Sequence, residues 1–114
     1  MEANIYNLSK AFALRVIRLY QYLQKSNEFV MSKQVLRSGT SIGANVKEAK
    51  NAQSKSDFIS KMNIALKEAD ETVYWLELLH ESGYIDDAQF ASINEDSQHI
   101  VATLINIVKT SKKQ

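Results

Sequence analysis

The chain has 114 residues, enough for one hydrophobic core but not for two, and we expect a single domain over residues 1–114. It contains no proline, three glycines and 45% hydrophobic residues, a composition that favours long uninterrupted helices over a turn-rich β fold. The absence of cysteine excludes disulfides, thiolate zinc sites and a cysteine nucleophile. Because the formal net charge is only +1, any argument for an anionic partner must rest on where the charges lie.

The sequence also bears on the compartment. No apolar run approaches the roughly 20 residues of a transmembrane helix, and no secretory signal is recognisable. We therefore expect a soluble, cytoplasmic protein that has no membrane partner.

Hydrophobic residues recur at three- and four-residue steps in four segments, which predicts four amphipathic helices. The first helix covers about residues 3–25. The second covers about residues 28–52, and Asn27 is a plausible N-cap for it.

The third helix covers about residues 56–82 and ends at Gly83, which can adopt the left-handed conformation of a helix terminus. The fourth covers about residues 87–110 and is followed by a short polar tail. Asp86, with Gln89 three residues later, predicts a capping box at its start.

The second helix is unusual because small and polar residues occupy positions that normally face a core. With Val35 at heptad position a, the core-facing residues are Val35, Ser38, Ile42, Asn45, Ala49 and Ala52. Gly39 and Gly43 lie four residues apart in the same helix, each at a cost of about 1 kcal/mol relative to alanine. We expect another part of the protein to approach this helix closely or to bond to it.

We call the polar residues of this helix the polar seam; they are Arg37, Ser38, Ser41, Asn45 and Glu48. We interpret the two serines, the asparagine and Glu48 as residues that specify helix register through buried hydrogen bonds, in preference to a ligand site. Arg37 is either a surface charge or the partner of Glu68 or Glu71, and we favour the ion pair.

Short connections between long helices predict an all-α fold, an antiparallel up-down-up-down four-helix bundle. In that topology the end with both termini and the loop between the second and third helices carries eight lysines and three acidic residues. The opposite end carries two lysines and five acidic residues.

Seven of the eight lysines are candidates for binding nucleic acid, because lysine acts on phosphates as a sequence-independent point charge. We call them the lysine pole; they are Lys47, Lys50, Lys55, Lys61, Lys109, Lys112 and Lys113. The alternative is that they only complement helix dipoles near helix C-termini.

Two short motifs of the sequence are those of an enzyme with two metal ions. Glu77 and His80 have the Glu-x-x-His spacing of such sites, and Asp96 with His99 has a variant of it. In antiparallel helices the two motifs would be offset by roughly 15 Å along the axis, too far for a dinuclear site. No nucleophile–base set or phosphate-binding loop is recognisable either. We therefore predict that the protein is not an enzyme and has no metal, cofactor or small-molecule substrate.

Three aromatic residues are candidates for a subunit interface. Tyr20 and Tyr22 lie in the first helix and Trp75 in the third. Large aromatic side chains with a polar group suit such contacts, although Trp75 is equally suited to the core.

Four segments carry a family resemblance. Residues 34–48 read Q-x-x-R-S-G-T-S-I-G-A-N-V-x-E, and they are followed by matching segments at 56–58, 65–69 and 71–76. In these segments the chain resembles the four-helix-bundle proteins of the 23S rRNA-intervening-sequence family, and all five residues of the polar seam match characteristic family positions.

The resemblance implies a small bacterial protein, often encoded in insertions within 23S ribosomal RNA genes, that assembles into a homopentameric ring. The family is similar in fold to the accessory variability protein of diversity-generating retroelements, which partners a reverse transcriptase and binds nucleic acid through a basic surface. No catalytic residues are established for the 23S rRNA-intervening-sequence family, so the resemblance implies none in this chain. Our leading hypothesis is a non-enzymatic homo-oligomer that binds RNA or a nucleoprotein, and the alternative is a protein-interaction scaffold that does not bind nucleic acid.

Overall fold

The computed structural model describes residues 3–114, and this part of the chain forms four α-helices and no strand. The helices are α1 (Ala3–Lys25), α2 (Met31–Lys50), α3 (Lys55–Glu81) and α4 (Asp87–Lys113). The prediction of an all-α protein is confirmed.

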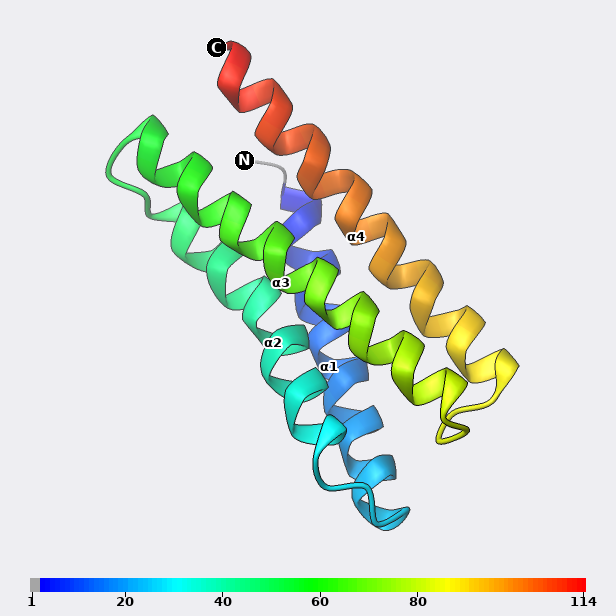
Figure 1. The fold of residues 1–114 in the computed structure, drawn as a ribbon. Helices are drawn as coiled ribbons and strands as arrows, with labels where there is room; N and C mark the ends of the chain where they lie inside the picture. Colours follow the sequence, from blue (N-terminus) through cyan, green and yellow to red (C-terminus); the bar gives the residue numbers. More distant parts are fainter. Residues whose placement is uncertain (1–2) are drawn as a thin grey trace.

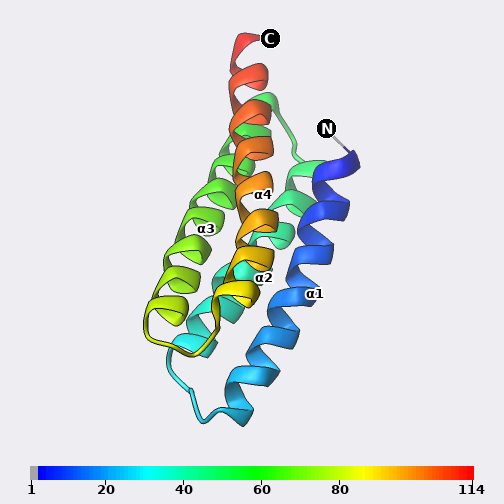
Figure 2. The ribbon, with the colours of Figure 1, turned by 90° about the vertical axis from the view of Figure 1, so that its right-hand side faces the viewer.

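Consecutive helices lie side by side, and the chain reverses its direction at each loop (Figures 1 and 2). The molecule is elongated, with extents of 46 × 20 × 18 Å. The start of α1, the α2–α3 loop and the end of α4 lie at one end of the molecule, and the other two loops lie at the opposite end (Figure 1). The first and last helices contact each other less than the sequential pairs do.

The hydrophobic core runs along the inside of all four helices, to which Phe12, Ile42, Leu76 and Leu104 each contribute a fully buried side chain. In α2 the buried stripe differs from the heptad prediction, because Val46 is buried while Asn45 is only half-buried. The buried residues Ser32, Val35, Gly39, Ile42, Val46 and Ala49 alternate at steps of three and four, so the heptad repeat holds with Val35 at position d. The register predicted from the sequence, with Val35 at position a, is therefore wrong.

The start of α2 differs from the sequence prediction. Asn27 is not its N-cap but has a φ of 62°, the left-handed conformation that lets the chain leave α1. The helix begins at Met31, and the buried carboxylate of Glu28 accepts hydrogen bonds from the backbone N–H groups of Ser32 (2.6 Å) and Val30 (3.3 Å). A glutamate three residues before the first residue of the helix thus satisfies donors that a capping side chain would normally bind.

The turn between α3 and α4 follows the prediction. Gly83 has a φ of 87°, and the N–H groups of Gly83 and Tyr84 donate to the carbonyls of His80 and Leu79. The capping box is present, with the Asp86 carboxylate and the Gln89 side chain each bonded to the other's backbone.

The end of α4 is longer than expected. This helix continues to Lys113, so Lys112 and Lys113 belong to its last turn and not to a polar tail.

The two glycines of α2 face α1. A methyl group on Gly39 would collide with the side chain of Val16, and one on Gly43 would stand 3.4 Å from the hydroxyl oxygen of Ser9. The expected close approach to this helix is therefore made by α1.

Candidate nucleic-acid interface

The lysines of the lysine pole lie near the helix ends at which the sequence predicts them. Lys47 and Lys50 are in the last turn of α2, Lys55 is the first residue of α3, and Lys112 and Lys113 are in the last turn of α4. These helix ends meet at one end of the molecule (Figure 1). The topology thus gathers basic groups from three helices.

Two of the seven lysines have a partner within the chain. The ammonium of Lys61 lies 3.5 Å from the Glu48 carboxylate, and that of Lys50 lies 4.7 Å from the centre of the Tyr6 ring. The remaining five lysines are exposed, and none of them forms an ion pair with residues 5–114. Their charges are therefore available to an anionic partner.

Lys61 has a different partner from the one that its sequence neighbours suggest. Asp57, four residues earlier and at the spacing that favours a helical ion pair, instead accepts the backbone N–H of Gln53 at 3.3 Å and so holds the α2–α3 loop. Lys61 instead joins α3 to α2 through Glu48. Of the lysine pole, it is the least suited to bind a phosphate.

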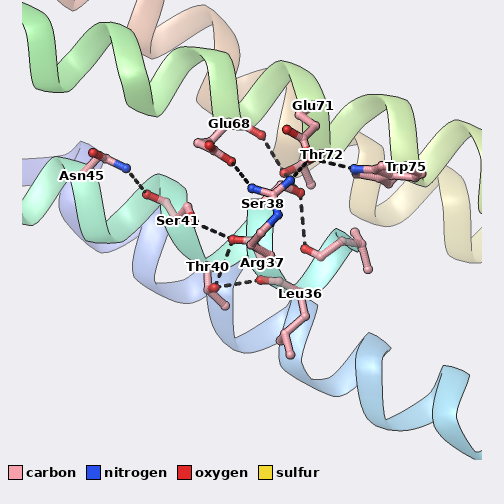
Figure 3. Close-up of polar contacts among 11 residues, drawn as sticks. Leu36, Arg37, Ser38, Thr40, Ser41, Asn45, Glu68, Glu71, Thr72 and Trp75 are labelled. Carbon is pink, nitrogen blue, oxygen red and sulfur yellow. Dashed lines mark hydrogen bonds and ion pairs between the residues drawn. The ribbon is translucent and has the colours of Figure 1, made fainter. Parts of the chain in front are cut away.

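The polar seam runs along the contact between α2 and α3; Figure 3 labels all of its residues except Glu48, which contacts Lys61 of α3. Its buried member is Ser38, whose hydroxyl accepts a hydrogen bond from Thr72 of α3 at 2.9 Å. The Thr72 hydroxyl also lies 2.8 Å from the carbonyl oxygen of Glu68. This pair of hydroxyls is a polar contact inside an otherwise apolar interface, and it sets α2 and α3 at one register.

Arg37 forms the ion pair favoured from the sequence, and it does so with both glutamates. Its guanidinium lies 3.3 Å from the Glu68 carboxylate and also donates to Glu71 (Figure 3). The same Glu71 oxygen accepts the indole N–H of Trp75 at 2.9 Å. Arg37 is half-exposed, so this network borders solvent.

The other seam residues bond differently from the prediction. The Ser41 hydroxyl donates to the carbonyl of Arg37 at 2.6 Å, and the Asn45 amide donates to the carbonyl of Ser41 at 2.9 Å. Both bonds stay within α2 (Figure 3), and Glu48 is exposed. Only Ser38 therefore makes the buried, register-setting bond that the sequence predicts for four residues.

The three aromatic interface candidates do not form one surface. Tyr20 and Tyr22 are two residues apart in α1 and so point in different directions. Tyr22 is 44% exposed and lines a groove between α1 and α4 with Arg15 and Arg18. Trp75 is half-buried, packs against the core and lies at the α2–α3 contact.

The two histidines lie apart from the lysine pole. His80 stacks on Phe90 and contacts the Asp87 carboxylate at 2.7 Å in the turn between α3 and α4. His99 is an exposed residue of α4. In the described residues there is no group of three or more histidine, aspartate or glutamate side chains that could hold a metal ion. Among the same residues, none of the helices combines the length and hydropathy that crossing a bilayer requires.

The fold and these contacts define an all-α protein of four helices with a lysine-rich end and a polar contact between α2 and α3. The chain belongs to the family of 23S rRNA-intervening sequence proteins, whose model matches residues 1–106. This confirms the resemblance carried by the polar seam and the segments that follow it.

A crystal structure from Bacteroides thetaiotaomicron, of a protein with unknown function from the S23 ribosomal protein family, is similar in both sequence and fold. The identity is 57% and the TM-score is 0.91, over 92% of this chain and 98% of that one. A comparison with curated proteins finds no match.

Proposed function

We propose that this protein is a non-enzymatic subunit with an up-down-up-down antiparallel topology. It assembles into a homo-oligomer, a pentamer by family resemblance, and binds RNA or a nucleoprotein through the lysine pole. The observation that carries this proposal is the group of five exposed lysines without an intramolecular ion pair at one end of the molecule: Lys47, Lys55, Lys109, Lys112 and Lys113.

The charges of these lysines support binding because each ammonium that replaces a condensed counterion on a nucleic acid contributes to affinity at low salt. Because the net charge of the chain is only +1, the chain as a whole attracts an anion weakly, and a nucleic acid would be attracted to the lysine-rich end. Assembly strengthens that presentation: copies arranged with one orientation bring their lysine poles together, and their potentials add.

The experiment is a fluorescence-anisotropy titration of a structured RNA at several salt concentrations. The pole variant combines Lys50→Glu and Lys55→Glu. The matched control combines Lys25→Glu and Lys33→Glu, which reverse the charges of two exposed lysines near the opposite end of the molecule. We expect the slope of log affinity against log salt to become shallower by about two for the pole variant and to stay unchanged for the control. Absence of binding at low salt, or equal effects of the two variants, would contradict the proposal.

The oligomer is tested separately by light scattering. A mass near five times the 12.9 kDa of one chain is expected, and a monomer in dilute solution would contradict the assembly.

A protein-interaction scaffold is the second candidate, and exposed apolar residues favour it. Phe29 and Val30, adjacent in the loop between α1 and α2, are 50% and 73% exposed, so they offer a small apolar contact point to a partner protein. Capture from a bacterial lysate with and without nuclease separates the two functions. A protein partner that is retained after nuclease treatment, and lost in the Val30→Ser variant, supports the scaffold.

A further inference from the structure

A pocket of about 630 Å³ opens at the lysine pole between the start of α3 and the end of α4. The two helices separate toward this end of the molecule (Figure 1), and side chains from both line the space. Its volume lies within the range of about 300 to 1,000 Å³ in which small-molecule and cofactor sites fall. It therefore has room for one nucleotide.

The lining combines three kinds of group. Phe58 is half-buried and packs against the core, which fixes the position of its ring at the wall of the pocket. Asn106 and Thr110 are exposed on α4, and their side chains have no hydrogen-bond partner among residues 5–114. Lys55, also in the lining, forms no ion pair with residues 5–114.

We propose that this pocket receives one unpaired base of a single-stranded nucleic acid. The base stacks on Phe58, its polar edge bonds to Asn106 and Thr110, and the adjoining phosphate lies at Lys55. The inference rests on the proposed function and extends it, because phosphate contacts alone carry no preference for unpaired bases.

Other ligand classes fit less well. An acyl chain would leave the amide of Asn106 and the hydroxyl of Thr110 without partners, and a free inorganic anion would meet one lysine beside an aromatic ring. A base needs both an aromatic face and polar groups at its edge, which is the combination that proteins use for single strands. A duplex keeps its bases paired and stacked, so it cannot use the pocket.

The test compares two ten-nucleotide oligomers that carry the same phosphates, oligoadenylate and its abasic counterpart, by competition anisotropy at fixed low salt. We expect the native protein to bind the oligoadenylate about tenfold more tightly, since stacking on an aromatic residue is of that order. Phe58→Leu and Asn106→Ala should bring this ratio toward one and leave the affinity for the abasic oligomer unchanged. Phe90→Leu, which shortens a half-buried aromatic residue at the other end of the molecule, is the matched control and should keep the ratio.

The outcomes separate the two proposals. If the native protein binds neither these oligomers nor the structured RNA, the proposed function fails. If it binds both oligomers equally, the lysine pole acts on phosphates alone and the base site is wrong. If circular dichroism shows that Phe58→Leu is unfolded, the variants Asn106→Ala and Thr110→Val test the base site instead, because both residues are exposed and their replacement should not disturb the fold. An unchanged affinity ratio in both variants would overturn the site.

Discussion

Gly39 of α2 lies so close to Val16 of α1 that a β-carbon at Gly39 would stand 2.8 Å from both γ-carbons of the valine. The valine side chain is branched at its β-carbon and cannot move aside by a small rotation. The contact therefore depends on glycine at this position, in spite of the low helix propensity of glycine.

Gly39→Ala and Gly43→Ala are expected to change stability in opposite directions. Each gains roughly 1 kcal/mol of helix propensity, but overpacking against Val16 costs about 1–3 kcal/mol and reverses the sign for Gly39→Ala. At Gly43 the nearest atom is 3.4 Å away, so alanine should be neutral or stabilising. Urea denaturation at matched protein concentration measures both, and a more stable Gly39→Ala variant would refute the close contact.

The hydroxyl pair of Ser38 and Thr72 predicts a measurable coupling. Ser38→Ala and Thr72→Val should each destabilise the protein by about 1 kcal/mol, because each leaves a buried polar group with a lost partner. The double variant should cost less than the sum, since it removes both groups together. Additive effects in the double-mutant cycle would show that the bond does not join α2 to α3.

Glu28 is expected to control the start of α2. Glu28→Ala should lower the free energy of unfolding by about 1–2 kcal/mol, in the range of a lost helix cap, because two backbone donors lose their acceptor. Glu81→Ala, at an exposed position of α3, is the control and should have an effect below about 0.5 kcal/mol. Denaturation of both variants, with hydrogen exchange at Ser32, checks the local cause.

The two glutamates that bind Arg37 should differ in their effect. Glu71 accepts from both Arg37 and Trp75, so Glu71→Ala should cost about 1 kcal/mol. Glu68→Ala removes only the longer contact to a half-exposed arginine and should cost a few tenths of a kcal/mol. Equal losses in chemical denaturation would mean that the bond to the indole contributes nothing.

Single charge reversals should rank the lysines by their pairing. Lys55→Glu should weaken RNA binding more than Lys61→Glu, because the charge of Lys61 is already partly neutralised by Glu48. Titrations at one low salt concentration are sufficient, and the reverse ranking would show that the Lys61–Glu48 pair opens on binding.

The sequence predicts the helices well because their signals are local. The repeat of hydrophobic residues, the capping box at Asp86 and the left-handed Gly83 all lie within a few residues of the feature that they define. The prediction that Asn27 is an N-cap was wrong because asparagine is favoured both at N-caps and in the left-handed conformation. The sequence alone does not distinguish these two uses.

The contacts between helices were harder to predict. The prediction that Asn45 faces the core is wrong because it takes Val35 as heptad position a, whereas Val35 and Ile42 occupy position d and Val46 occupies position a. The pocket was missed entirely, since Phe58 and Asn106 meet only after α3 and α4 have packed, and neither residue carries a local signal for this.

Trp75 is the only tryptophan of the chain, and its indole is bonded at the place where α3, α2 and solvent meet. The protein therefore carries a built-in optical reporter whose emission comes from one known location. A shift of that emission on assembly or on addition of a ligand would show that the surroundings of the α2–α3 contact change in that step. A constant emission would indicate that assembly or binding takes place at the ends of the molecule.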